Sequence, residues 1–191
     1  MGFVYSLIRV RPETVAALRD NPRGVAEFVY GDPGLYEAPS RGLLQRLFGK
    51  PEPDPRLVPA RREEDEIDLD KSWHIVHYLL TGSDNATDSP LNIIADESDR
   101  LADIDVGLGP PFVIHPDAVS SFAAAAAELS DEQFLSRLRP SEMPLDTLYL
   151  GEAVRENPGE MGEYAVENLH FLRDFAQKAA DAGDAVITYY S

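Results

Sequence analysis

Two histidines and the only tryptophan of the chain lie close together near its middle. If residues 69–82 form a helix, its period of 3.6 residues places Asp70, His74 and His77 on one polar stripe. Trp73 then lies on an apolar stripe beside them. No other segment combines side chains of this chemistry with so clear a helical pattern, so the candidate site residues are drawn from here.

A metal ion is the first chemistry that fits the polar stripe. His74 and His77 stand at i and i+3, close enough to share a metal while Asp70 orients His74. Such a site would need further ligands, from His115, His170 or a carboxylate elsewhere. The zinc-protease motif, in which histidines at i and i+4 flank a glutamate, is absent.

Proton transfer and ligand binding are the other two candidates. Asp70 and His74 could form an acid–base dyad that activates water, because the chain has no cysteine and no Gly-x-Ser-x-Gly turn to supply another nucleophile. Alternatively, Trp73, His77 and Tyr78 would line a pocket or a partner-binding groove.

The same residues also have a purely structural interpretation. Asp70 would cap the helix, Trp73 would anchor the core, and the histidines would be hydrogen-bonded packing residues. The sequence favours this interpretation, because neither a complete set of metal ligands nor a protein nucleophile is recognisable.

Composition narrows the classes of function. The net charge of −17, from 34 acidic and 17 basic residues, argues against binding to nucleic acid or to an anionic membrane. The absence of cysteine excludes thiolate metal sites and thiol catalysis. No apolar run is long enough for a transmembrane helix. We therefore expect a cytoplasmic protein that needs no cofactor.

The elements that position these residues indicate an α+β fold. We expect a mainly helical single domain over residues 1–191, with a small sheet that includes the N- and C-terminal strands. Strands are predicted at residues 3–10, 112–114 and 184–190. Helices are predicted at residues 12–20, 24–30, 69–82, 116–129, 130–138 and 161–182. Gly82 and Gly183 are placed to end their helices, and Ser130 and Gln133 form a capping-box pattern.

The last helix shows the clearest apolar stripe. Its members recur at helical spacing and are Ala165, Leu169, Leu172, Ala176 and Ala179, widened by Phe171 and Phe175.

A proline-rich variable insertion is expected at about residues 31–66, where prolines break any regular element. Its basic residues, which end at Arg61 and Arg62, are followed directly by the acidic run 63–66. We expect these charges to neutralise one another rather than to bind a polyanion.

The run over residues 69–82, LDKSWHIVHYLLTG, resembles the signature of the YfbM-like family, small bacterial proteins of unknown function. Supporting matches keep the family's order along nearly the whole chain. They are the Leu-Phe-Gly piece at 47–49, Ser-Pro-Leu at 89–91, the Gly-Pro turn and helix start over 109–119, and Phe-Leu-Arg at 171–173. One departure is Leu150, where similar proteins usually have proline. The resemblance implies an α+β domain of bacterial, cytoplasmic origin, and it supplies no catalytic residues.

The leading hypothesis is therefore a non-catalytic binding module for a protein or a small ligand. Its site would be a cleft beside the Trp-His helix, formed by Asp70, Trp73, His74, His77 and Tyr78. The first alternative is a metal-assisted hydrolase that uses His74 and His77. The second is an acidic inhibitor of a basic effector, as charge-complementary immunity proteins are.

Overall fold

A four-stranded antiparallel sheet stands at the centre of the computed structural model, which describes residues 2–32, 61–104 and 108–191. The strand order is β2-β1-β4-β3. The bounds are Tyr5–Val10 for β1, Glu66–Asp68 for β2, Phe112–Ile114 for β3 and Ala185–Tyr190 for β4. The two terminal strands pair along their full length, from Tyr5 opposite Tyr190 to Val10 opposite Ala185, which confirms the predicted sheet.

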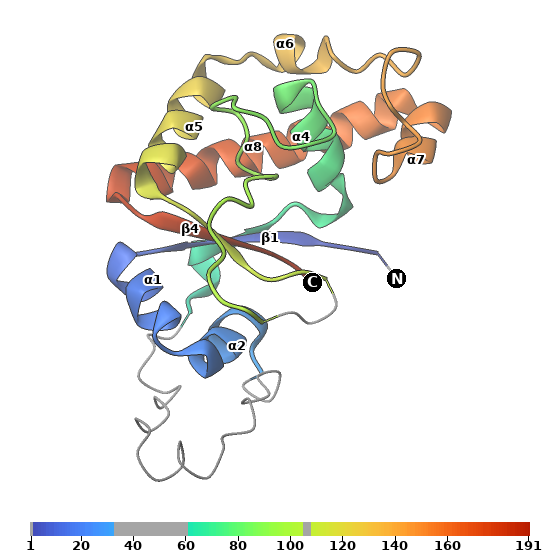
Figure 1. Cartoon of the computed structure of the whole chain (residues 1–191). Helices are drawn as coiled ribbons and strands as arrows, with labels where there is room; N and C mark the ends of the chain where they lie inside the picture. The colour runs from blue at the N-terminus through green and yellow to red at the C-terminus, as the bar shows by residue number, and fades with distance from the viewer. Residues whose placement is uncertain (1, 33–60, 105–107) are drawn as a thin grey trace, which may run out of the picture.

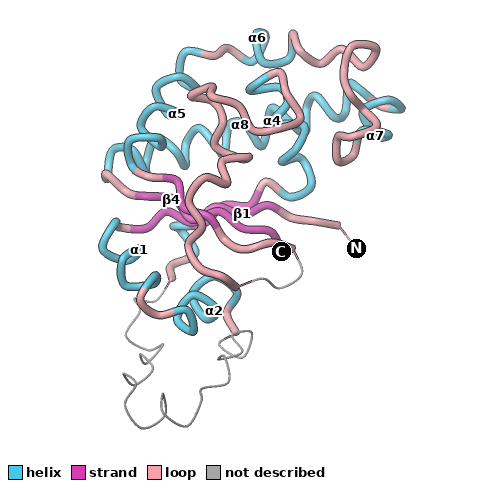
Figure 2. Tube along the Cα trace, in the orientation of Figure 1, coloured by secondary structure: helices cyan, strands magenta, loops and turns pink. Residues whose placement is uncertain are grey.

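Helices cover both faces of this sheet (Figure 1). On one side lie α4 (Trp73–Thr81), α5 (Pro116–Glu128) and α8 (Pro158–Ala182), with the short helices α6 (Asp131–Leu135) and α7 (Gly151–Glu156). On the other side lie α1 (Pro12–Arg19) and α2 (Pro22–Tyr30). Two 3-10 turns, Glu63–Asp65 and Asp70–Ser72, flank β2. Figure 2 shows how the strands form the thin layer between the two groups of helices.

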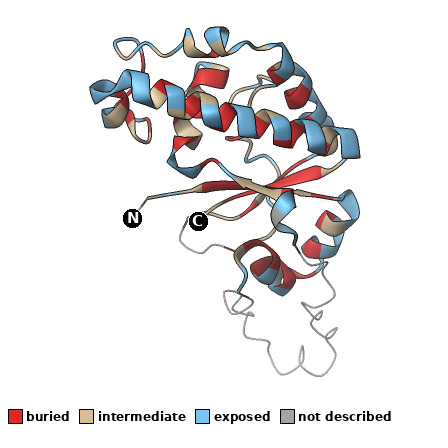
Figure 3. Ribbon diagram, turned by 180° about the vertical axis from the view of Figure 1, so that it is seen from behind, coloured by how far each residue is buried: buried red, intermediate tan, exposed pale blue. Residues whose placement is uncertain are grey.

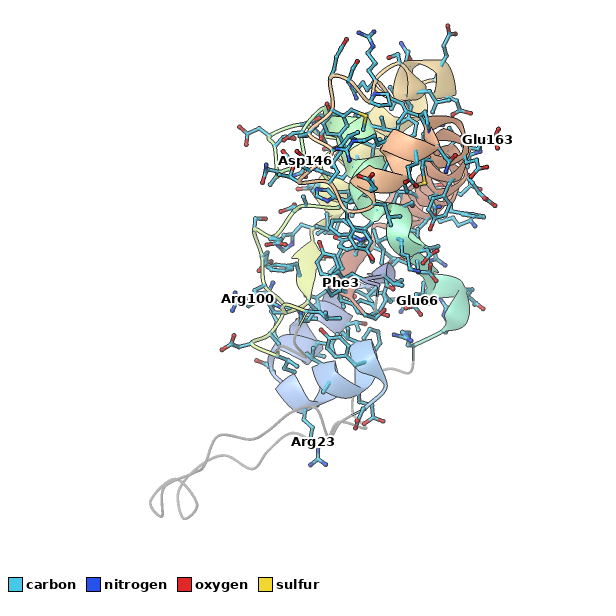
Figure 4. All side chains as sticks on the ribbon, turned by 90° about the vertical axis from the view of Figure 1, so that its right-hand side faces the viewer. Phe3, Arg23, Glu66, Arg100, Asp146 and Glu163 are labelled. Atoms are coloured by element: carbon cyan, nitrogen blue, oxygen red, sulfur yellow. The ribbon has the colours of Figure 1, made fainter. Side chains whose placement is uncertain are left out.

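Alternation along the strands gives the protein two apolar clusters, one on each side of the sheet. In β1, Leu7 packs with the residues of α4, α5 and α8, whereas Ile8 packs with those of α1 and α2. Buried positions accordingly run through the sheet and into the helices on both sides (Figure 3). In the side view of Figure 4, Phe3 lies between Glu163 in the larger helical layer and Arg23 in α2. The larger cluster is the one that supports the Trp-His helix.

Several predicted helix signals are confirmed. Gly82 and Gly183 end α4 and α8 with φ of +79° and +68°, values that favour glycine. The Ser130 hydroxyl accepts from Gln133 N–H, and the Gln133 side chain accepts from Ser130 N–H. The apolar stripe of α8 is buried, with one correction. Phe171 is 53% exposed, because it lies about 100° around the helix axis from buried Leu172.

Other boundaries differ from the prediction. The Trp-His helix begins at Trp73 instead of residue 69, because residues 70–72 form a 3-10 turn in which Asp70 has φ of +45°. The helix that starts after Ser130 ends at Leu135, and α8 begins at Pro158 instead of residue 161. Strand β2 and helix α7 were not predicted.

Most of the predicted insertion at 31–66 lies outside the described residues, so it stays a prediction. At its end, Arg61 pairs with Glu66, and the Arg62 side chain pairs with Asp65 at 2.6 Å. The expected neutralisation is therefore confirmed for these two arginines. Among the described residues, none of the helices has the length and apolarity that crossing a bilayer requires.

A long loop after α4 links the two apolar clusters. Its first part places Ile93 and Ile94 in the larger cluster, and its later part places Leu101 in the smaller one. Near its end the loop pairs with β3, where Val113 N–H donates to the carbonyl oxygen of Asp99 at 2.8 Å. The loop therefore passes along the β3 edge of the sheet and walls off the space beside α4 (Figure 1).

Candidate functional site

A cleft with a volume of about 1110 Å³ opens beside α4. Trp73, His74 and His77 line it from α4, and residues between 84 and 98 line it from the loop. Ala118 and Ser121 contribute from α5, Ile114 from β3 and Tyr190 from the end of β4. The cleft thus joins elements that are far apart in the sequence.

Trp73 forms the aromatic part of the wall. Its ring is half-buried and stacks on His74 with the ring centres 4.7 Å apart, while Tyr190 meets it edge-on at 5.1 Å. Tyr149 stacks on it at 5.8 Å. The indole Nε1 is buried and has no hydrogen-bond partner in the described part of the chain. Trp73 is therefore both a packing residue and a wall of the cleft.

Both ring nitrogens of His74 are occupied by main-chain groups. Nδ1 lies 3.0 Å from the backbone N–H of Tyr149, and Nε2 lies 2.9 Å from the carbonyl oxygen of Asp84. Because Nδ1 accepts a hydrogen bond, it carries no proton, so the proton is on Nε2 and is donated to Asp84. No lone pair remains on this ring to bind a metal or to take a proton from a substrate.

His77 differs from His74 in having one ring nitrogen unused. Nε2 donates to the carbonyl oxygen of Asn85 at 3.0 Å, so Nδ1 carries the lone pair of the neutral ring. The residue is only 1% exposed, and Nδ1 has no partner among the described residues. Burial lowers the pKa of His77 from its ordinary value, and the neighbouring His74 lowers it further, against the Asn85 carbonyl and the Asp84 charge.

A third unpaired atom is Oδ1 of Asn92, which is also buried and lacks a partner within the described ranges. Asn92 lines the cleft with Trp73 and His77. Buried polar groups in proteins are almost always hydrogen-bonded, and leaving one unpaired costs about 1–3 kcal/mol. The three residues that carry these unpaired atoms all line the cleft, although the atoms themselves are covered by their neighbours.

The charge of the cleft is negative. Asp84, Asp88, Asp96 and Glu97 line it, and among the described residues neither lysine nor arginine does. The Thr147 hydroxyl donates to Asp84 at 2.5 Å, which holds the pKa of that carboxyl below its usual value.

Tyr190 contributes a protonated phenol to the same cleft. Burial raises the pKa of Tyr190 to about 12, and the charge of Glu97 adds to this effect.

The structure brings together three of the five residues that the sequence nominated. Trp73, His74 and His77 line the cleft, and Asp70 and Tyr78 do not. The Asp70 carboxylate instead accepts a hydrogen bond from the Tyr164 hydroxyl of α8 at 2.7 Å. Tyr78 is half-buried and packs against the larger apolar cluster.

The residues proposed to complete a metal site are also elsewhere. His115 pairs with Asp99 and His170 with Asp131, both outside the cleft. Over residues 2–32, 61–104 and 108–191, no group of three or more His, Cys, Asp or Glu side chains is arranged to hold a metal ion.

Sequence reasoning missed Asn92 and Tyr190 as members of the site. The Tyr189-Tyr190 pair carried the signal for one of them, because successive side chains of a strand point to opposite faces. Tyr189 is buried in the smaller cluster, so Tyr190 must face the side of α4. Asn92 lies in an irregular loop, where no periodic pattern indicates which way a side chain points.

Comparisons with known proteins give a family and a fold. The model of a family described as a domain of unknown function, DUF1877, matches residues 1–189. A solved structure of YfbM from Escherichia coli, titled as a protein of unknown function, superposes with a TM-score of 0.64. It shares 14% sequence identity, and the match covers 98% of this chain and 99% of that chain. A comparison with curated proteins finds no match.

Proposed function

We propose that this chain, which belongs to the DUF1877 family of YfbM-like proteins, is a non-catalytic binding module with a small ligand in the cleft beside α4. The observation that carries the proposal is that three residues lining one cleft each carry a buried polar atom without a partner in the described part of the chain. These atoms are the indole Nε1 of Trp73, Nδ1 of His77 and Oδ1 of Asn92. A ligand that pairs with these atoms regains hydrogen bonds that the folded chain itself does not supply.

The size and lining of the cleft suit a small molecule. Ligand pockets typically measure about 300–1,000 Å³ and combine apolar walls with a few fixed polar groups. This cleft measures about 1110 Å³ and has both kinds of wall, with Ile93 and Ile114 beside Trp73 and His77. The unpaired atoms are covered in the free protein, so a ligand reaches them when neighbouring side chains move aside.

The hydrolase alternative has less support. His74 has no nitrogen left for a metal or a proton, and Asp70 bonds to Tyr164 instead of orienting a histidine. His77 alone does not make a hydrolytic centre. The acidic-inhibitor alternative rests on the net charge of −17.

A pair of matched substitutions on α5 tests the proposal. Ala118 is exposed and lines the cleft, whereas Ala124 is equally exposed on the same helix but does not line it. Ala118→Trp should place a large ring in the cleft and obstruct it, and Ala124→Trp should add the same bulk elsewhere. A library of small polar and aromatic compounds is then screened by thermal unfolding against the wild type and both variants.

We expect compounds that raise the melting temperature of the wild type and of Ala124→Trp, but not that of Ala118→Trp. At a hundredfold excess over Kd, ligand binding adds about 2.7 kcal/mol to the free energy of unfolding. For a domain of this size this corresponds to a rise of about 5–10 °C. Hits that act equally on Ala118→Trp, or no hits at all, would contradict a ligand site in the cleft.

A further inference from the structure

We infer that the ligand of this cleft is an organic cation that carries N–H donors, a protonated amine or a guanidinium. The inference rests on the proposed binding function and names the chemistry of its ligand. It stands on two independent observations, the hydrogen-bonding capacity of the buried atoms and the charge of the wall around them.

Two of the three unpaired atoms are hydrogen-bond acceptors, so they favour a ligand that carries hydrogen-bond donors. Because Nε2 of His77 already gives its proton to the Asn85 carbonyl, Nδ1 can only accept. Oδ1 of Asn92 also accepts and is buried without a partner in the described part of the chain. An ammonium or a guanidinium presents several N–H donors at once, which is the chemistry that these two acceptors lack.

The charges call for a cation. Asp84, Asp88 and Glu97 line the cleft, and no lysine or arginine among the described residues balances them there. A phosphate or a carboxylate would meet like charges along the loop, whereas a cation would be attracted to them. The carboxylates alone would not define a site. The second observation is His77, which lines the same cleft, is 1% exposed and has an unpaired acceptor.

Two aromatic rings of the wall suit the same ligand. Trp73 and Tyr190 line the cleft with their centres 5.1 Å apart and their planes inclined at 73°. Because His74 and Tyr149 already stack on the Trp73 ring, the two rings offer an apolar surface to the carbon skeleton of an organic cation.

Quaternary ammonium probes separate the contribution of hydrogen bonding to ligand binding from the contribution of charge. A trimethylammonium group has the charge and can bind aromatic rings, but it has no N–H to give to His77 or Asn92. It should therefore bind more weakly than the corresponding primary amine, by about tenfold for one lost hydrogen bond to a charged group.

The test measures binding by calorimetry, at low salt, for two sets of probes. The cationic set is 1,4-diaminobutane, spermidine, agmatine, 2-phenylethylamine and the trimethylammonium analogue of 2-phenylethylamine. The comparison set is 2-phenylethanol and 3-phenylpropanoate, which keep the ring and replace the cation with a neutral or an anionic group. We expect at least one N–H cation to bind the wild type and Ala124→Trp but not Ala118→Trp, ahead of the quaternary, neutral and anionic probes.

A second pair of variants isolates the charge of the cleft. Glu97→Gln and Glu128→Gln each remove one exposed carboxylate, but only Glu97 lines the cleft. Glu97→Gln should weaken amine binding about fivefold, and Glu128→Gln should leave it within about twofold. Equal effects of the two variants would overturn the assignment of the cation to this wall.

The outcomes distinguish this inference from the proposed function. If neutral or anionic probes bind in the cleft and the amines do not, the binding function stands and the cationic ligand is wrong. If no probe binds in a way that Ala118→Trp abolishes, both are contradicted.

Discussion

The backbone N–H of Tyr149 donates to Nδ1 of His74 at 3.0 Å, across 75 positions of the sequence. This bond fixes the tautomer of His74 and directs its Nε2 proton to the carbonyl oxygen of Asp84. Through these two hydrogen bonds, His74 connects the loop after α4 and the segment before α7 to helix α4. A residue that the sequence nominated for chemistry at the cleft instead holds the cleft together.

Replacing His74 should therefore reduce stability even though the residue is polar. His74→Phe keeps a ring that can stack on Trp73, but it leaves the Tyr149 N–H and the Asp84 carbonyl without their partner. We expect a loss of about 2–4 kcal/mol in the free energy of unfolding, measured by urea denaturation. His115→Phe is the control, because the exposed His115 side chain bonds the Asp99 carboxylate and no main-chain group of the described residues, and it should cost less than about 1 kcal/mol. Equal costs would show that the two main-chain bonds contribute little.

Substitutions of Trp73 separate its contribution to core packing from its contribution to ligand binding. If Trp73 were fully enclosed in the core, Trp73→Ala would lower the free energy of unfolding by about 3–5 kcal/mol. If it only lined an open pocket, the loss would be about 1 kcal/mol. Its half-buried ring contacts Tyr5, Tyr149 and Tyr190, so we expect Trp73→Ala to cost about 2–3 kcal/mol. Trp73→Phe should cost less, because it removes a buried N–H that has no partner, yet it should still weaken ligand binding. Calorimetry beside urea denaturation separates the two effects.

Gly151 shows where the chain tolerates no side chain at all. A Cβ built there would lie 1.9 Å from the carbonyl oxygen of Leu145, a main-chain atom that cannot move away on its own. The residue before it, Leu150, has φ of +62°, a conformation that proline cannot adopt. We expect Gly151→Ala to cost about 3 kcal/mol, whereas Gly159→Ala, with open space around its Cβ, should be neutral or stabilising by about 0.5–1 kcal/mol. Thermal unfolding of the two variants tests this contrast.

The sequence predicted those parts of the fold that local patterns determine. Glycine at the end of a helix and the Ser130–Gln133 capping box act within a few residues, so they can be predicted from the local sequence alone. Strand β2 was missed because it is three residues long and lies at an edge of the sheet, where pairing with β1 makes it a strand. Its acidic, short sequence has no periodic pattern of its own.

The candidate site shows the same contrast between residues that a local pattern places and residues that only the tertiary fold places. The helical period placed His74 and His77 on one stripe, and the structure finds both on the cleft wall. Asp70 left that stripe because its positive φ ends the helix pattern before Trp73 and turns its carboxylate to Tyr164. Asn92 reaches the cleft only through the tertiary course of a long loop, which no local pattern reports.

His77 gives the structure a defined response to acid. Burial is the main reason that its pKa lies below the ordinary value of about 6.5. As the pH falls below about 6.5, the unfolded chain takes up a proton at this residue that the folded chain does not. The free energy of unfolding should therefore be fully retained above about pH 6.5 and should decrease as the pH falls toward the lowered pKa, with a slope of at most about 1.4 kcal/mol per pH unit.

The measurement is urea denaturation between pH 7.5 and 5.5, where most carboxylates stay ionised. His77→Gln should be less stable at pH 7.5 but should show a flatter dependence, because the titrating group is gone. His170→Gln, which changes an exposed histidine that pairs with Asp131 outside the cleft, should not flatten the dependence as His77→Gln does. Protonation of His77 would also convert its only free acceptor into a donor, so amine binding should weaken over the same pH range. If the wild type and His77→Gln gave parallel curves, the pKa of His77 would be the same in the folded and unfolded states, and Nδ1 would be in contact with water instead of being a buried acceptor.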